Sequence, residues 1–445
     1  MAKQTIKFYC TNCDYRPPKW IGCCSECNEW GSITELQPTL SSKVGSTSGA
    51  LALTNLQEVS PLTHTRILSH IGEWDRVMGG GIVPGSLLIL TGDPGIGKST
   101  LLLQVVHQLA QDHHVLYFSS EESLEQVRGR AQRLNCLNNN ILFSDQANLG
   151  SIIATCEQQK PTLIVVDSIQ NCFSGDTHTI PGSVGQLRES AFHLMRLAKE
   201  HNIATILTGH ITKEGHIAGP KMLEHMVDGV FYLQGEDQYH IRILRSVKNR
   251  FGPIHELGFF QMEEQGLQEV PNINQILLEQ ATFAPGSVLT STLEGSRPLM
   301  LELQALTVPS KFGIPQRVIS GIDHKQVVLI AAILEKYLRI KLSEQDIFFK
   351  VSGGFKIKES AADLAIAMAL LSSYYQKPLA HKSLVLGEMS LTGDIKPTNR
   401  MQLHMNEAEK FGIETLFTAK AKGMKSSVKL RQFSSVYELL ELFSE

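Results

Sequence analysis

Short apolar runs alternate with longer segments of helical periodicity between residues 66 and 275. The apolar runs, which have the length of buried strands, are at residues 87–92, 115–120, 162–167 and 204–210. The segments between them that show helical spacing are residues 98–111, 122–134 and 184–201. Strands that alternate with helices in this way predict an α/β domain, in which a parallel sheet is flanked by crossover helices.

The pattern changes after residue 275. Residues 276–445 mix strand candidates with Ala-rich helical segments, and they show no short-period repeat. The strand candidates are SVLTSTL, LMLELQALTV, IFFKVS and SLVLGEM, and the helical segments are residues 324–338 and 359–374. This mixture predicts a separate α+β domain.

The N-terminal part of the chain differs from both. Residues 36–65 are rich in Ser, Thr and Gly and have no sustained period, so we predict a flexible linker there. Before it, residues 1–35 hold five of the eight cysteines. The chain is thus expected to consist of a small cysteine module, a linker and two larger domains.

Composition narrows the functional classes. Hydrophobic residues make up 42% of the chain and charged residues 19%, which is typical of a globular protein. The net charge is −3, so DNA binding would have to come from local basic loops. No apolar run approaches the roughly 20 residues that a membrane span needs, and the first ten residues lack the apolar core of a signal peptide. We therefore expect a cytoplasmic protein without a membrane partner.

A phosphate-binding loop follows the first apolar run. Residues 92–99 match the pattern G-x-x-x-x-G-K-[ST], and a helical segment begins near Lys98. Glycines let the chain wrap around a phosphate so that main-chain amides point inward. The lysine reaches the β- and γ-phosphates of ATP, and the Ser99 hydroxyl is a ligand for Mg²⁺. The predicted nucleotide-binding residues of this loop are Gly92, Asp93, Pro94, Gly95, Ile96, Gly97, Lys98, Ser99 and Thr100.

Carboxylates after two other strands complete the predicted ATP site. Asp167 ends the run TLIVVD and is the favoured acid on the Mg²⁺ side. Hydrolysis also needs a group that polarises the attacking water. Glu121 and Glu122 follow the run VLYFSS, and either carboxylate could reach the γ-phosphate. We favour Glu121. The alternative is that both are only first-turn charges that suit a helix dipole.

Four cysteines have the spacing of a zinc site. Cys10 and Cys13 form one C-x-x-C pair, and Cys24 and Cys27 form another ten residues later. Two such pairs complete a tetrahedral site with four thiolates, which leaves no open position and is therefore structural. Cys23 is an alternative to Cys24, but the symmetric spacing selects Cys24. Disulfides are a second alternative, disfavoured for a protein in a reducing compartment.

Together these motifs resemble the RadA (Sms) family of bacterial recombination and repair ATPases, nearly from end to end. The matching segments are WIGCC (20–24), DRVMGGGIVPGSLLILTGDPGIGKSTLLLQ (75–104), FSSEESLEQVRGRAQRL (118–134), VVDSIQ (165–170), PGSVGQLRE (181–189), GHITKEG (209–215) and SVKNRFGPIHELGFF (246–260). The family's own signature is KNRFG at 248–252. The resemblance implies a RecA-like core in a homo-hexameric ring on single-stranded and branched DNA, which drives branch migration of intermediates made by the RecA recombinase.

The resemblance also implies roles for individual residues. Lys248 and Arg250 would reach the γ-phosphate bound by the neighbouring subunit, whereas without the family a solvated turn would be preferred. His210 and Lys213 would sense the γ-phosphate. DNA would pass the loops at 173–185 and 212–222, with Arg188 and Lys221 as phosphate partners. A basic run is either a DNA-facing patch or a solvated face; it consists of Lys420, Lys422, Lys425, Lys429 and Arg431.

Residues 285–445 resemble the proteolytic domain of Lon, which uses a Ser–Lys dyad. Ser360 falls on the nucleophile, but Gln402 stands where that family has its lysine. Ser360 then lacks a base, so we expect no peptidase activity, although Lys396 and Arg400 lie near enough in sequence to compensate. An ATP-dependent peptidase and a nucleotide-gated DNA scaffold remain the alternatives to a DNA-dependent ATPase motor.

Overall fold

The computed structural model describes residues 7–13, 15, 17–36, 55, 57, 65–173, 183–210, 223–236, 241–311, 313–421 and 426–443. The contacts divide the chain into two compact units. One consists of Met1–Gly235 with Arg242–Glu269, and the other of Glu236–Ile241 with Val270–Glu445. The domain limit expected at residue 275 falls inside helix α7 (Ile273–Glu279), which belongs to the second unit.

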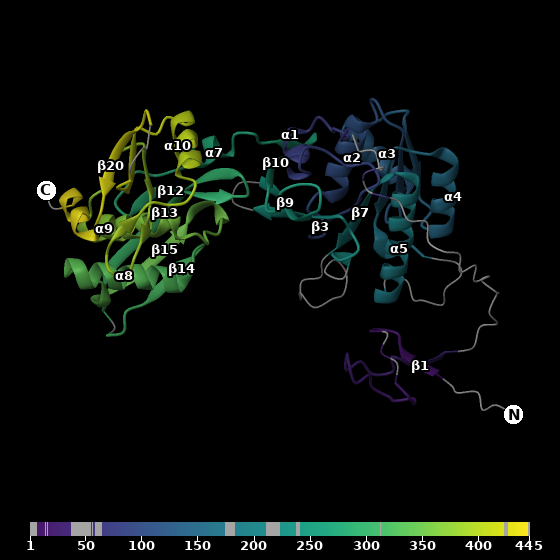
Figure 1. Cartoon of the computed structure of the whole chain (residues 1–445), viewed down its shortest axis with the longest axis horizontal. Coiled ribbons are helices and arrows are strands. Elements are labelled where there is room, and N and C mark those ends of the chain that lie inside the picture. The colour runs from purple at the N-terminus through teal and green to yellow at the C-terminus, as the bar shows by residue number, and fades with distance from the viewer. Residues whose placement is uncertain are drawn as a thin grey trace. The chain divides into compact units, whose positions relative to one another are not determined.

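The first unit is built on a nine-stranded sheet with the order β11-β10-β9-β8-β3-β7-β6-β4-β5 (Figure 1). The six strands from β8 to β5 pair in parallel, which confirms the predicted α/β core. The strands are β3 (Leu87–Gly92), β4 (Val115–Ser119), β5 (Ile141–Ser144), β6 (Leu163–Asp167), β7 (Ala204–His210), β8 (Gly229–Glu236), β9 (Ile241–Asn249), β10 (Leu257–Glu263) and β11 (Gly266–Glu269).

Helices cover both faces of this sheet, as alternate residues of β3 show. Leu88 and Leu90 belong to a core with helices α2 and α3. Leu87 and Ile89 face the opposite way, into a core with α4 and α5. The helices are α1 (Gly72–Val77), α2 (Lys98–Leu109), α3 (Leu124–Arg133), α4 (Leu149–Gln159) and α5 (Val184–His201). Burial on both faces explains why the parallel strands are continuous apolar runs.

The cysteine module contains one small antiparallel pair. Strands β1 (Lys7–Cys10) and β2 (Ile33–Leu36) pair from Lys7 with Leu36 to Cys10 with Ile33. The pairing closes a loop that holds the other four cysteines of the module. Of the predicted linker, residues 37–54, 56 and 58–64 lie outside the described residues.

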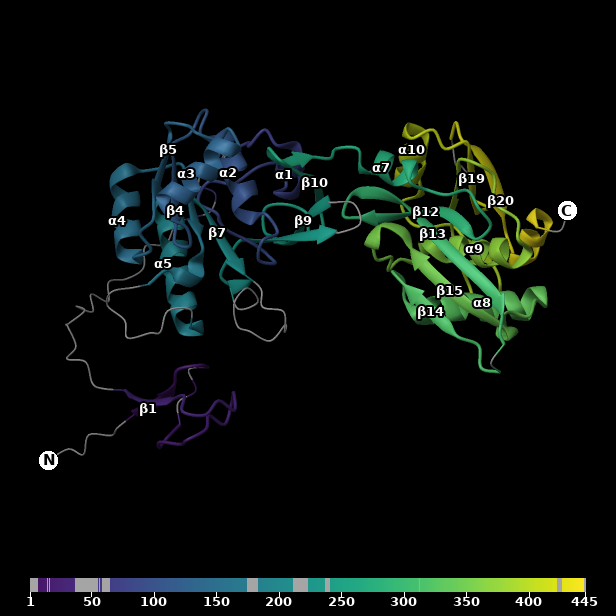
Figure 2. The same cartoon turned by 180° about the vertical axis from the view of Figure 1, so that it is seen from behind.

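The second unit is the predicted α+β domain (Figure 2). Its seven-stranded mixed sheet has the order β14-β15-β13-β12-β16-β19-β20. Helix α9 is buried along nearly its whole length, and α10 covers a second core on the sheet. The strands are β12 (Ser287–Glu294), β13 (Arg297–Pro309), β14 (Arg317–Ser320), β15 (Gln345–Val351), β16 (Ser383–Leu386), β19 (Thr415–Ala419) and β20 (Lys429–Phe433). A separate two-stranded sheet is formed by β17 (Glu388–Met389) and β18 (Ile395–Lys396). The helices are α7, α8 (His324–Leu338), α9 (Asp363–Tyr375) and α10 (Met401–Lys410).

Among the residues that the structure describes, no helix is both long enough and apolar enough to span a bilayer.

Candidate nucleotide and metal sites

The phosphate loop joins the end of β3 to the start of α2. Gly92, Gly95 and Gly97 adopt φ values of +152°, +75° and +111°. A Cβ atom on Gly92 would lie 2.1 Å from the Leu233 carbonyl oxygen, so no larger residue fits there. Gly97 is the N-cap of α2 and has no side chain to occupy the first-turn amides. A helix N-terminus without a side-chain cap is suited to bind an anion through its main-chain amides.

Lys98 is buried inside this loop. Its ammonium group donates hydrogen bonds to the carbonyl oxygens of Gly92 and Asp93, at 3.0 Å each. Burial lowers the pKa of Lys98, while the nearby charges of Asp167, Glu121 and Asp93 raise it. The Lys98 ammonium group thus interacts electrostatically with Asp167, the predicted acid on the Mg²⁺ side, and with Glu121, the acid predicted to polarise water.

Asp167 is held rigidly between two neighbouring strands. It ends β6, which lies between β4 and β7 in the sheet, and it is only 6% exposed. Tyr117 of β4 donates its hydroxyl to Oδ2 at 2.7 Å, and Thr208 of β7 donates to Oδ1 at 2.6 Å. Burial, with the adjacent Asp167 charge, raises the pKa of Tyr117 well above its usual range, so it remains a donor. Neither residue was singled out from the sequence.

The two glutamates after β4 have different partners. The Ser168 hydroxyl, next to Asp167 in the chain, donates to Glu121. Glu122 instead forms an ion pair with Arg130 of α3. The Glu121 charge also raises the pKa of Lys98. These contacts support the choice of Glu121 as the residue facing the nucleotide.

The remaining predicted nucleotide-site residues surround the same loop. Ser99 and Thr100 lie half-buried in the first turn of α2. His210 pairs with Gly92 in the register of β3 and β7, which places its backbone beside the phosphate loop. Lys213 lies outside the described residues. The loop and the carboxyl ends of β6 and β7 therefore meet at one edge of the sheet.

Lys248 and Arg250 lie at the opposite end of β3. Lys248 donates to the carbonyl oxygens of Glu224 and Val227, the latter at 2.8 Å. Arg250 forms an ion pair of 3.3 Å with Asp228, whose backbone amide donates to the carbonyl oxygen of Leu87. Leu87 begins the strand that Gly92 ends, so about 17 Å of β3 separates the backbone contact of Asp228 from the phosphate loop. Neither basic residue belongs to the phosphate loop of its own subunit.

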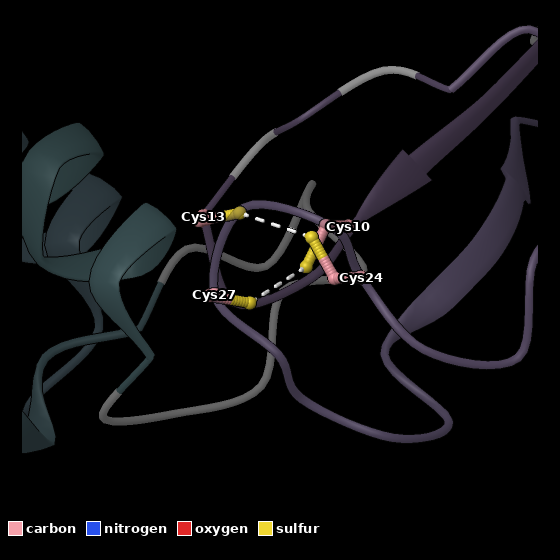
Figure 3. Close-up of side chains that lie close together, drawn as sticks. All are labelled: Cys10, Cys13, Cys24 and Cys27. Carbon is pink, nitrogen blue, oxygen red and sulfur yellow. Dashed lines mark hydrogen bonds between the residues drawn. The ribbon is translucent and has the colours of Figure 1, made fainter.

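The four predicted zinc ligands converge (Figure 3). The sulfur atoms of Cys10, Cys13, Cys24 and Cys27 all lie within 4.8 Å of one another. The Cys10–Cys27 and Cys13–Cys24 sulfur distances are 3.6 and 3.5 Å. A tetrahedral site with Zn–S bonds of about 2.3 Å has sulfurs about 3.8 Å apart, so the cluster fits a zinc ion. None of the eight cysteines forms a disulfide bond, which argues against the disulfide alternative. Cys23, the alternative to Cys24, lies outside the cluster.

Comparison with known proteins adds the family. "DNA repair protein RadA" of Streptococcus pyogenes serotype M6 is 44% identical over 424 residues, which cover 94% of each chain. The protein of the same name from Helicobacter pylori is 41% identical over 446 residues, covering 99% of this chain and 100% of the relative. The chain belongs to the RadA family of DNA repair proteins. Its membership confirms the resemblance that the sequence motifs indicated.

Two family models match parts of this RadA-family chain. The AAA domain model matches residues 56–216, which contain the phosphate loop and Asp167. The model for subunit ChlI of Mg-chelatase matches residues 313–422 of the second unit. The RadB recombinase structure, at 22% identity and a TM-score of 0.38, covers 46% of this chain and 99% of its own. The AAA match is consistent with an ATP-hydrolysing domain.

Most of the predicted DNA-contact residues lie outside the described residues: 174–182, 212–222, Lys422 and Lys425. Arg188 is exposed near the start of α5. Lys429 and Arg431 are exposed on β20, the last strand of its sheet. Lys420 forms an ion pair of 3.6 Å with Glu438. Lys429 and Arg431 thus lie exposed at the edge of the sheet.

Ser360 lines a cavity of about 470 Å³ in the second unit, together with Lys358 and Arg400. Gln402, at the position of the Lon lysine, donates instead to Asn406 at 2.8 Å on α10. Lys396 is exposed on β18. Arginine stays protonated and does not act as a base. Neither Gln402 nor Arg400 therefore supplies the general base that a peptidase needs.

Proposed function

We propose that this RadA-family chain is a DNA-dependent ATPase that drives branch migration of recombination intermediates made by RecA. The observation that carries the proposal is the arrangement of Lys98, Asp167 and Glu121 around one phosphate loop. This arrangement supplies a cation for the triphosphate, an acid on the metal side and an acid for the attacking water. An ATP hydrolase needs these three groups, whereas a protein that only binds DNA does not.

The residues of the site have separate roles in this proposal. The main-chain amides of residues 92–100, except that of Pro94, which has no N–H, and the ammonium group of Lys98 bind the triphosphate. Ser99 and Asp167 hold Mg²⁺, which neutralises charge on the β- and γ-phosphates. Tyr117 and Thr208 fix the Asp167 carboxylate by direct hydrogen bonds. Glu121 orients the attacking water, and His210 detects the γ-phosphate beside Gly92.

A ring completes the site. Because Lys248 and Arg250 lie at the far end of β3 from the loop, they are suited to the nucleotide of a neighbouring subunit. A cation supplied in this way stabilises charge in the transition state only when the subunits assemble. We propose a homo-hexamer that translocates on single-stranded DNA.

We further propose that the cysteine module binds one structural Zn²⁺ ion. A module of this size buries too little apolar surface to fold alone, so the metal would supply its folding free energy.

Removing the zinc is expected to unfold the module while the ATPase unit stays folded. In Cys13→Ser, or after chelation, amide protection of residues 7–36 should be lost, and the bound zinc should fall from one equivalent towards zero. The matched control is Cys23→Ser, because the Cys23 sulfur lies outside the cluster, 3.8 Å from the Cys24 carbonyl oxygen. Unchanged protection after chelation, or equal zinc loss in both variants, would contradict a four-cysteine zinc site.

Single-stranded DNA is expected to raise the rate of ATP hydrolysis, and added salt to weaken this effect. Phosphate contacts release counterions, so the DNA concentration needed for half-maximal stimulation should rise steeply between two salt concentrations. The measurement is steady-state ATP turnover with and without oligonucleotide. An unstimulated rate at both salt concentrations would exclude the motor, and DNA binding without any turnover would favour the scaffold.

A further inference from the structure

Asp228 is a buried carboxylate that belongs neither to the phosphate loop nor to the zinc cluster. It precedes β8, and its side chain is only 5% exposed. Its Oδ2 atom accepts hydrogen bonds from the Leu87 amide at 3.0 Å and from the Lys199 ammonium at 2.7 Å. Its Oδ1 atom lies 3.3 Å from Nη1 of Arg250. One acid therefore joins the start of β3, helix α5 and the KNRFG segment.

The backbone of Asp228 reinforces these contacts. Its amide donates to the Leu87 carbonyl oxygen at 2.8 Å, and its own carbonyl oxygen accepts from the Arg250 amide at 3.0 Å. The main chain at Arg250 is thus fixed to the sheet, whereas its side chain is 60% exposed and is held by an ion pair. The guanidinium group can leave while its backbone stays in place.

A departing guanidinium would leave a buried charge behind. Breaking a buried ion pair by removing one partner is costly, because the other charge is left uncompensated. Lys199 changes this cost, since its ammonium group remains on Oδ2 and also lies 5.8 Å from the centre of the Phe251 ring. Because two cations contact the Asp228 carboxylate, either one can leave without leaving that carboxylate unpaired.

We propose that Asp228 is a positioning residue for Arg250, and that Lys199 is the counter-ion that stays with Asp228 when Arg250 moves to the neighbour's triphosphate. The proposal rests on the proposed function, in which Arg250 acts across a subunit interface. Asp228 holds the guanidinium group near one orientation before the neighbour binds ATP. Lys199 keeps the free-energy cost of releasing the Arg250 guanidinium group small. Preorganisation of this kind raises the rate of the chemical step more than the affinity for substrate.

The first test is Asp228→Asn, which keeps an oxygen for the Leu87 amide and removes the charge. Displacing a catalytic group by about 1 Å costs on the order of 100-fold in rate. We therefore expect kcat for ATP, with saturating single-stranded DNA, to fall between about 10- and 100-fold while KM changes little. An unchanged kcat would overturn the proposal.

Mixed rings decide whether Asp228 acts through Arg250. Lys98→Ala subunits have a defective phosphate loop but an intact Arg250, and Asp228→Asn subunits have the reverse. Mixing the two should restore turnover where a normal loop faces a normal Arg250. Suppose that mixing restores turnover for Arg250→Ala with Lys98→Ala but not for Asp228→Asn with Lys98→Ala. Asp228 would then act on the phosphate loop of its own subunit rather than through Arg250. That result would overturn the role of Asp228 and leave the proposed function standing. If Arg250→Ala also fails to complement, the trans-acting site of the proposed function is wrong.

Lys199→Met supplies a second, independent variant should Asp228→Asn fold poorly. Without Lys199, Asp228 retains Arg250 more strongly, so kcat should fall at unchanged KM, and Lys98→Ala subunits should complement the loss. In the Asp228→Asn background the same substitution should have little further effect, because no buried charge then needs a counter-ion. Equal effects of Lys199→Met in both backgrounds, or a full rate in Lys199→Met alone, would overturn the role of Lys199.

Discussion

Replacing Lys98 with alanine is expected to lower ATP turnover by about 10³-fold, or roughly 4 kcal/mol of transition-state stabilisation. The substitution removes an ammonium group from inside the phosphate loop, where it now contacts the carbonyl oxygens of Gly92 and Asp93. It also removes a positive charge that interacts with Asp167 and Glu121. Added single-stranded DNA should not restore the rate, because DNA acts on a step that this site must carry out. Steady-state hydrolysis and single-turnover measurements would both report the loss.

The matched control for this variant is Lys341→Ala. Lys341 is an exposed lysine with one surface ion pair, to Glu344 at 2.9 Å, so its loss should leave turnover within about twofold. Thermal unfolding of both variants would separate a catalytic loss from a folding defect. DNA binding measured with a non-hydrolysable triphosphate tests the scaffold alternative. Branch migration at the normal rate in Lys98→Ala would rule out an ATP-driven motor.

The sequence predicted the parallel core well because its strands are buried on both faces. The apolar runs at 87–92 and 204–210 coincide with β3 and β7, and the helical segments at 184–201 and 324–338 with α5 and α8. In a strand that packs helices on both sides, nearly every residue is apolar, and the run stands out from its neighbours. The phosphate loop was equally clear, since its glycines are required by the backbone itself.

Other elements carried a weaker signal. Strand β5 (Ile141–Ser144) is short and partly exposed, and a basic residue at every third position interrupts the apolar residues of β9. Helix α7 lies next to the change in pattern near residue 275, and its assignment depends on tertiary contacts. Asn274 in that helix donates to the Pro298 carbonyl oxygen at 2.9 Å and to Glu407 at 2.8 Å. Such contacts are not local in sequence, so the limit of the unit could not be read from composition.

The residues that position the catalytic groups depend on strand order, which the chain does not reveal locally. Tyr117 and Thr208 are 50 and 41 residues from Asp167, and each lies within a largely apolar run. They meet Asp167 because β6 lies between β4 and β7 in the sheet. Asp228 likewise contacts Lys199, 29 residues away, only after the sheet and α5 have assembled. A hydroxyl group within an apolar run is the signal that would have marked Tyr117 and Thr208, and Thr205 of β7 carries the same signal.

Replacing Arg250 with alanine is expected to lower DNA-stimulated ATP turnover by about 10³-fold or more, which is the effect typical of a cation supplied in trans. Nucleotide affinity should change little, because the phosphate loop of each subunit is intact. The loss should appear only under conditions where the subunits assemble; at concentrations that dissociate the ring, the variant and the unchanged protein should hydrolyse ATP equally slowly. Turnover measured across a dilution series, alongside the oligomeric state, provides this comparison.

Two further variants show whether the effect belongs to Arg250 itself. Arg196→Ala removes a similarly exposed arginine that also pairs with a carboxylate, Glu200 at 2.9 Å, and it should leave turnover nearly unchanged. Lys248→Ala should resemble Arg250→Ala in turnover but also lower stability, because its ammonium group holds the Val227 and Glu224 carbonyl oxygens. If Arg250→Ala hydrolysed ATP at the normal rate in the assembled ring, the guanidinium group would have only its observed role, as a partner of Asp228. The phosphate loop at one end of β3 would then act in hydrolysis, and the Asp228–Arg250 ion pair at the other end would have no part in it.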